Sequence, residues 1–197
     1  MILNKFFYKS IIFFLLMLSC ENNGDIKPNI VFILTDDLGY ADLSSYGSEF
    51  INTPNLDDMA SDGAKLTSYY SSQAVCSASR AAILTGAYSN RIGINGAFGP
   101  KSKIGINQNE LLISEMLKEN GYKTGIFGKW HLGDADIFLP TRHGFDEFFG
   151  ILFSNDMWPF HPEIPHAFPD DLLLYKNENP IETLIDQSDL TKRITDE

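Results

Sequence analysis

One short stretch places a cysteine and an arginine where they could act together. Cys76 precedes the small, alanine-rich residues 77–84, which predict a helix, and the N–H groups at a helix N-terminus favour an anion such as a thiolate. Arg80 lies one helical turn further on, so its side chain projects from the same face. A phosphotyrosine-phosphatase loop would need Arg six residues after the Cys, where this chain has Ala82. The pair is therefore either a reactive centre of another kind or a small buried cysteine beside a surface arginine.

A pair of adjacent carboxylates offers a second kind of chemistry. Asp36 and Asp37 follow the apolar run Ile30–Leu34, which predicts a strand buried on both faces. Open α/β sheets place their ligand sites at the carboxyl ends of such strands. Neighbouring carboxylates repel each other unless a cation lies between them, and hard oxygen ligands suit Ca²⁺, with Mg²⁺ as the second choice. The alternative is a solvated turn that ends the strand.

Strand and helix patterns alternate along the rest of the chain and predict an α/β domain with a largely parallel central sheet. The expected helices cover residues 54–62, 77–84 and 111–119, the last capped by Asn109, and the expected strands cover 65–70 and 123–127. Residues 145–151 predict a further strand or turn, and residues 172–175 with 181–184 predict a hairpin. Residues 188–197 begin like a helix but have no C-cap. We therefore predict that residues 28–197 are the N-terminal, incomplete part of a larger domain.

The first twenty residues predict an export signal that is not part of the fold. Two lysines precede the apolar run 11–18, which is too short to cross a bilayer of about 30 Å, so residues 1–19 predict a signal peptide. The position of Cys20 resembles that of the lipidated cysteine in bacterial lipoproteins, and an ordinary signal peptide is the alternative. Residues 20–27 would form a polar tether. We expect an exported bacterial lipoprotein, periplasmic or at the outer membrane or cell surface, with its lipid in the membrane.

Composition excludes several classes of protein. The chain has 197 residues, a formal net charge of −11 and two cysteines. The negative charge argues against nucleic acid as a partner, because neutralising phosphates requires clustered Lys and Arg. Two cysteines cannot build a disulfide-rich scaffold or a four-cysteine zinc site. A hydrophobic content of 44% is enough for a packed core.

Four blocks of the chain occur in an order and spacing typical of one enzyme family. Cys76–Arg80 (CSASR) resembles the signature in which a cysteine is oxidised to formylglycine, although Ala78 stands where many members have Pro. Pro28–Asp37 resembles that family's opening strand with its metal-binding aspartates. Gly128–Gly133 (GKWHLG) and Gly144–Gly150 (GFDEFFG) resemble its next two blocks. The chain thus resembles the N-terminal part of a type I, formylglycine-dependent sulfatase of the arylsulfatase A-like branch. This implies an α/β sandwich like that of alkaline phosphatase.

The resemblance implies a calcium-dependent hydrolase of sulfate monoesters. Asp36 and Asp37 would be calcium ligands, and Cys76, as formylglycine, would be the nucleophile and would also approach the metal. A formylglycine-generating enzyme or an anaerobic sulfatase-maturating enzyme would be the partner that modifies it. The hydrated aldehyde has two hydroxyls, one to attack sulfur and one whose deprotonation releases sulfate. Calcium and nearby cations would reduce the repulsion between an anionic ester and its nucleophile.

The resemblance implies roles for further side chains. Arg80 would hold the formylglycine hydrate, Lys129 would bridge to sulfate or to the nucleophile, and His131 would take part in proton transfer. Lys129 and His131 are two residues apart, which would place both on one strand-like face, and a histidine satisfied within a loop is the alternative. Ser154 resembles a sulfate-contacting serine.

The implied substrate is a sulfate ester, and the expected export favours sulfated carbohydrate. One alternative is a phosphonate or phosphodiester hydrolase of the same fold. Another is an inactive, lipid-anchored module that binds sulfated glycan with Cys76 still a thiol. The family also needs a second metal-binding pair and a downstream His and Lys, and none can be assigned between Ser154 and Glu197. We therefore predict that these residues alone are inactive.

The remaining histidines and tryptophans have less specific interpretations. His161 and His166 could form a metal pair, but the prolines around them favour a surface loop near the substrate entrance. His143 matches no catalytic position. Trp158 is expected in the core, with stacking on a sugar as the alternative.

Overall fold

The computed structural model divides the described chain into two compact units. It describes residues 27–165, 167–168, 171–184 and 186–197. The division falls between Asn52 and Thr53. The predicted signal peptide, Cys20 and all but the last residue of the predicted tether lie outside the described residues. Within the described ranges, no helix is long and apolar enough to cross a membrane.

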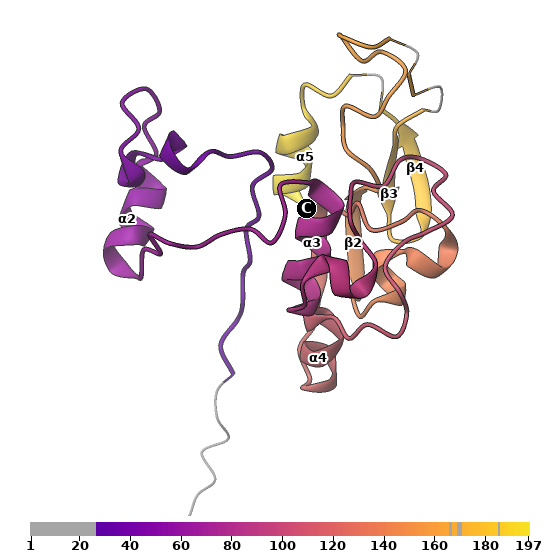
Figure 1. Ribbon diagram of the computed structural model, residues 1–197, viewed down its shortest axis with the longest axis horizontal. Coiled ribbons are helices and arrows are strands. Elements are labelled where there is room, and N and C mark those ends of the chain that lie inside the picture. The colour runs from indigo at the N-terminus through magenta and orange to yellow at the C-terminus, as the bar shows by residue number, and fades with distance from the viewer. Residues whose placement is uncertain (1–26, 166, 169–170, 185) are drawn as a thin grey trace, which may run out of the picture. The chain divides into compact units, whose positions relative to one another are not determined.

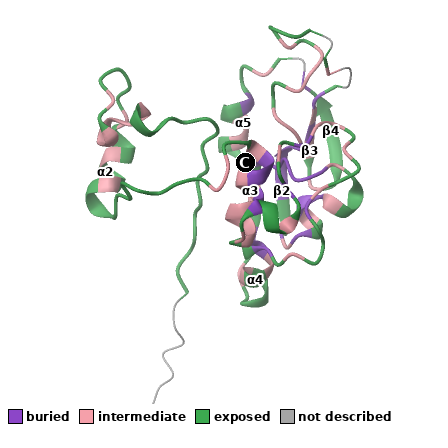
Figure 2. Cartoon of the chain, viewed as in Figure 1, coloured by how far each residue is buried: buried purple, intermediate pink, exposed green. Residues whose placement is uncertain are grey.

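The first unit, as far as it is described, contains two short 3₁₀ helices, η1 (Tyr40–Asp42) and η2 (Ser44–Tyr46), and no strand. The strand predicted at Ile30–Leu34 is therefore wrong for this structure. Its side chains are exposed, with Val31 at 83% of its full accessible area (Figure 2). A strand needs a neighbour for its backbone hydrogen bonds, and residues 27–52 contain no second extended segment paired with this one.

A four-stranded mixed sheet forms the centre of the second unit (Figure 1). Its strands lie in the order β1 (Gly125–Lys129), β2 (Glu147–Ile151), β3 (Leu173–Lys176) and β4 (Asn179–Thr183). Strands β1 and β2 pair in parallel, whereas β2–β3 and β3–β4 are antiparallel. The prediction of a largely parallel sheet is thus corrected for the described residues, because β3 and β4 form the predicted hairpin and join the sheet by it.

Four α-helices were expected, and the structure shifts some of their ends. They are α2 (Pro54–Asp62), α3 (Cys76–Thr85), α4 (Ile113–Glu119) and α5 (Leu190–Asp196). The backbone N–H of Leu112 donates to the Glu115 carboxylate at 2.8 Å, so Glu115 and not Asn109 caps α4. Residues 65–70 are exposed and form no strand, which overturns that prediction.

Two apolar clusters form the core, and alternate residues of β2 contribute to each. Phe148 packs in one cluster with residues of α3, and Phe149 packs in the other with Leu190 of α5. Successive strand residues point to opposite faces of a sheet. Helices α3 and α5 therefore cover opposite faces of the sheet, and β2 is buried between them from its second residue on.

Glycines allow β1 and β2 to approach closely. Gly128 lies opposite Gly150 in the parallel register. A Cβ atom added to Gly150 would lie 1.9 Å from the carbonyl oxygen of Gly128, and Gly150 has a φ of +155°. No side chain fits there. The two glycines thus hold in place the strand that ends at Lys129.

Candidate active site

Helix α3 begins at Cys76, as the sequence predicts within one residue. Val75 before it is extended, and the chain turns into the helix at the cysteine, whose side chain is half-buried. Ala78 and Ala81 are fully buried against the sheet. Small residues on this face let the helix pack closely, so the start of α3 is fixed by the core.

The structure brings three of the predicted site residues together. A guanidinium N–H of Arg80 donates to the backbone carbonyl of Lys129, which joins α3 to the end of β1. The Nζ of Lys129 donates to the Oγ of Ser154, 3.3 Å away. Residues 80, 129 and 154 are far apart in the sequence, and their contacts place two cationic groups and a hydroxyl beside the helix that Cys76 begins. Such a group of donors can hold an anion.

His131, two residues after Lys129, is fully buried. Its Nε2 donates to the carbonyl oxygen of Phe98 at 2.7 Å, and its backbone N–H donates to Leu152 at 3.1 Å. Strand β1 ends at Lys129, and His131 has a φ of +59°. The two side chains therefore do not share a strand face as predicted, because the backbone leaves the extended conformation between them.

Asp36 and Asp37 lie in an exposed bend of the first unit, and Asp37 has a φ of +56°. Two adjacent carboxylates fit a hard divalent cation by their chemistry, but they supply only part of the roughly six to eight oxygen ligands that calcium takes. Within the described ranges, no three His, Cys, Asp or Glu side chains are grouped so that they could hold a metal. The predicted grouping of Cys76 with this pair stays a prediction.

His143 is a buried histidine for which sequence analysis found no role. It lies beside the Trp130 ring, with centroids 6.0 Å apart, and its carbonyl accepts a hydrogen bond from the Ser114 hydroxyl at 2.6 Å. Burial lowers the pKa of His143, while the negative charge of Glu115 opposes that shift. The neutral ring is therefore part of the core that supports β1.

The loop after Ser154 contains His161 and Trp158, which both make contacts within the second unit. The Nδ1 of His161 accepts the backbone N–H groups of Glu163 and Ile164 at 3.1 and 3.2 Å, so the ring organises its own loop. The second member of the suggested metal pair, residue 166, lies outside the described residues. Trp158 is half-buried and packs against the cluster around Phe149, so it lies at the edge of the core.

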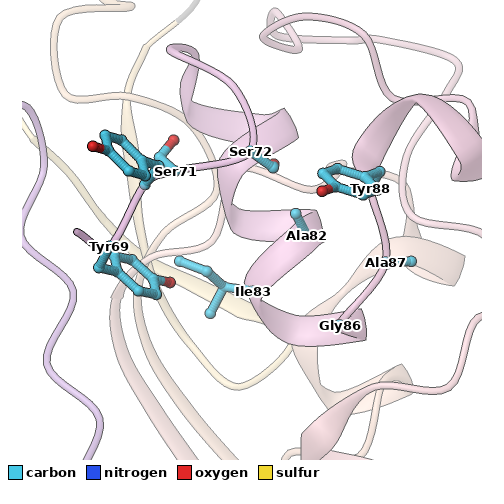
Figure 3. A pocket seen from close by; sticks show the side chains of 9 residues that line it. Tyr69, Ser71, Ser72, Ala82, Ile83, Gly86, Ala87 and Tyr88 are labelled. Carbon is cyan, nitrogen blue, oxygen red and sulfur yellow. The ribbon is translucent and has the colours of Figure 1, made fainter. Parts of the chain in front are cut away.

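A hollow of about 320 Å³ lies beside α3 (Figure 3). Tyr69 and Tyr88 flank it, and Ala82 and Ile83 of the helix line its floor. None of the predicted site residues lines it. The hollow is therefore separate from the group formed by Arg80, Lys129 and Ser154.

Two positions that support the site have no signal in the sequence. The Oγ of Ser77 accepts a hydrogen bond from the backbone N–H of Phe98 at 3.0 Å, and the carbonyl of Phe98 accepts one from His131. Ser77 was noted only as part of a motif, and Phe98 was not singled out at all. A contact across 21 residues to an irregular segment leaves no periodic pattern, so only the folded chain reveals it.

Comparison with known proteins identifies the family. The sulfatase family model matches residues 28–193. This chain belongs to the sulfatase family. It is 47% identical to bovine (Bos taurus) arylsulfatase A over 135 residues, which are 67% of this chain and 27% of that protein. It is 37% identical to human arylsulfatase G over 188 residues, which are 85% of this chain and 36% of that protein. The chain thus spans about a third of the length of the curated sulfatases it matches.

Solved structures, a sulfatase among them, match most of this chain. The crystal structure of Ps i-CgsB superposes with a TM-score of 0.70 and 37% identity, over 80% of this chain and 38% of the other. The PsFucS1 sulfatase from Pseudoalteromonas sp. has a TM-score of 0.69 and 30% identity, over 83% of this chain and 38% of the other. The mixed α/β arrangement of the second unit therefore resembles part of a sulfatase domain.

Proposed function

We propose that this sulfatase chain is the N-terminal part of a sulfuric ester hydrolase that uses a formylglycine derived from Cys76 and a calcium ion. The observation that carries the proposal is the contact chain from Arg80 through Lys129 to Ser154, beside the helix that begins at Cys76. These residues lie in the motifs to which the resemblance assigns the handling of sulfate. We further propose that the complete domain is a sandwich like that of alkaline phosphatase.

The described residues would bind and orient the sulfate group. Lys129, with its ammonium beside the Ser154 hydroxyl, provides a positive charge and a hydrogen-bond donor for sulfate oxygens. Arg80 is held against the end of β1 by its bond to the Lys129 carbonyl, which keeps a second charge next to the helix. Fixed cations stabilise the charge that develops on a transferring group without reorganising during the reaction.

The modified cysteine and the metal supply the chemistry that these side chains cannot. A hydrated formylglycine offers one hydroxyl for attack on sulfur and a second whose deprotonation can release sulfate. Asp36 and Asp37 would hold the calcium ion together with ligands from elsewhere in the complete protein. Calcium would lower the repulsion between an anionic ester and an incoming oxygen nucleophile. His131, whose Nε2 donates to Phe98, would hold or move a proton near the site.

Sulfated carbohydrate is the substrate class that we propose. Ps i-CgsB, which is 35% identical over the matched residues, has been crystallised with k-i-k-neocarrahexaose. The expected signal peptide and lipidated Cys20 would place this sulfatase outside the cytoplasm, anchored to a bacterial membrane and exposed to polymeric glycans. A formylglycine-generating or anaerobic sulfatase-maturating enzyme would act on it before it functions.

The decisive experiment measures the modification and the activity of the same preparation. The complete gene product, co-expressed with a maturating enzyme, is digested, and the mass of the peptide containing residue 76 is determined. We expect the formylglycine mass and hydrolysis of an aryl sulfate. Cys76→Ala, which cannot be oxidised to the aldehyde, should lose at least about a thousandfold in kcat/KM.

Three outcomes distinguish the alternatives. A thiol at residue 76 in every active preparation would refute the proposed nucleophile and favour the glycan-binding module. Faster hydrolysis of an aryl phosphodiester than of an aryl sulfate would favour the phosphodiesterase alternative. Turnover by residues 1–197 alone would contradict the prediction that they lack essential ligands.

A further inference from the structure

The second residue of α3 makes a buried contact to a distant irregular segment. Ser77 has no exposed surface, and its Oγ accepts the backbone N–H of Phe98 at 3.0 Å. The Phe98 side chain is also buried, in the cluster that contains Ala78 and Leu132. The backbone around residue 98 is neither helix nor strand, so this hydrogen bond, together with the buried ring, holds the segment in place.

The other polar group of Phe98 binds the histidine expected to handle a proton. The Phe98 carbonyl oxygen lies 2.7 Å from the Nε2 of His131, and His131 is fully buried. A carbonyl can only accept, so Nε2 must carry the hydrogen. In the neutral ring, Nδ1 is then the nitrogen with the lone pair. The main chain at Phe98 thus decides which His131 nitrogen can accept a proton.

We propose that Ser77 is a positioning residue for His131, acting through the two backbone groups of Phe98. Its hydroxyl holds the N–H of Phe98, and together with the buried ring this fixes the Cα from which the carbonyl of the next peptide unit projects toward His131. The carbonyl then keeps the hydrogen of His131 on Nε2. Ser77 follows Cys76 directly on α3. The same residue therefore holds both the proposed nucleophile and the histidine in position. This inference rests on the proposed sulfatase function for its kinetic consequence, but its structural part does not.

Removing the hydroxyl should affect His131 and not only the fold. In Ser77→Ala, the buried N–H of Phe98 loses its acceptor, and the backbone at Phe98, with the two peptide units that meet at its Cα, is expected to move so that this N–H finds another one. The carbonyl would then bind Nε2 less well, and the ring would lose its fixed orientation and single tautomer. Ser77→Thr keeps a hydroxyl at the same position and should preserve the contact.

The direct test is nuclear magnetic resonance of the complete protein labelled with ¹⁵N in its histidines. His131→Gln assigns the His131 signals by their disappearance. We expect the wild-type ring to carry its hydrogen on Nε2, and Ser77→Ala to shift the His131 ring signals and to mix the two tautomers. Ser79→Ala is the matched control, because its hydroxyl lies on the same helix but contacts the exposed Ser71 hydroxyl at 3.1 Å.

Kinetics on an aryl sulfate provide the second readout, with rates divided by the formylglycine content of each preparation, since residues 77 and 79 lie in the modification motif. Ser77→Ala should lower kcat by about tenfold with KM changed less than about twofold, as expected when positioning and not binding is lost. Ser77→Thr should recover kcat to within about threefold, and Ser79→Ala should stay within about twofold of wild type.

Each result bears on the inference. A wild-type His131 with its hydrogen on Nδ1 overturns it even if no Ser77 variant folds. Unchanged His131 signals and an unchanged kcat in Ser77→Ala also overturn it. If the ring signals behave as expected but wild type hydrolyses no sulfate ester, the positioning contact stands and the proposed function fails.

Discussion

Two segments for which the sequence makes similar predictions, Ile30–Asp37 and Gly125–Gly133, have different structures. Both contain apolar residues that predict a strand, and both contain polar residues after it to which the resemblance assigns chemistry. Gly125–Lys129 forms β1, paired with the buried strand β2 in a sheet that has apolar clusters on both faces. Ile30–Leu34 forms no strand and is exposed, as Figure 2 shows by colour.

The difference shows that an apolar run becomes a strand only when a partner edge is available to it. The partner of β1 follows it within about twenty residues, and glycines at the contact allow close approach. In residues 27–52 no paired partner exists. The site residues carried by β1 and its neighbours are consequently in contact with one another. Asp36 and Asp37 lie in an exposed bend of the first unit.

The largest effect is expected from Gly150→Ala, which disrupts the pairing of β1 with β2. The added Cβ would collide with the carbonyl of Gly128, so β1 and β2 would have to separate. We expect a loss of more than about 4 kcal/mol in the free energy of unfolding, measured by urea denaturation. Gly96→Ala is the control, since a Cβ there has no atom within 4 Å. Equal stability of the two variants would contradict the close approach.

A matched pair of phenylalanines tests burial on the two sides. Phe148→Ala should cost about 3–5 kcal/mol, because this side chain is fully buried in the core of the second unit. Phe32→Ala, at a side chain that is 65% exposed, should change the stability of residues 1–197 by less than about 0.5 kcal/mol. In the complete protein, Phe32→Ala should become costly if the remaining chain provides the missing strand partner. Thermal and denaturant unfolding of both lengths measure this.

A smaller effect is expected from His143, which is buried in the second unit. Burial lowers its pKa below the usual 6.5, so the unfolded chain binds this proton more readily than the folded one. Stability should therefore be greatest above pH 6.5 and decrease as the pH falls below that value. His143→Gln should decrease less in Tm between pH 7.5 and pH 5.5 than wild type does. The same decrease in both proteins would assign the pH dependence to other groups.

The smallest effect is expected at Asp146, which directly precedes β2 and contacts the residue before β1. The Lys118 ammonium, 2.7 Å from the Asp146 carboxylate, and the backbone N–H of Thr124 lower the pKa of Asp146. A lowered carboxyl pKa contributes stability above about pH 3.8 that is lost as the pH falls through the folded value. Asp146→Asn should lower Tm slightly at pH 7 and leave it unchanged near pH 2. Asp58→Asn, on exposed α2, should change Tm at neither pH.

The sequence alone determined the elements whose signals are local. The helix at Cys76, the hairpin formed by β3 and β4, and the family blocks around Arg80 and Lys129 follow from residue types and short spacings. Helix ends, turns and motifs depend on neighbours within a few residues, so they can be read from the chain. The sequence also predicts which side chains would carry the sulfatase chemistry, and that assignment stays a prediction.

Only the tertiary structure decided which of these elements have partners. It shows Ile30–Leu34 exposed, makes the sheet mixed, and turns His131 away from the strand face it was expected to share with Lys129. It also joins Ser77 to His131 through Phe98. Sheet pairing and buried hydrogen bonds depend on groups far apart along the chain, and no local pattern of residue types specifies them.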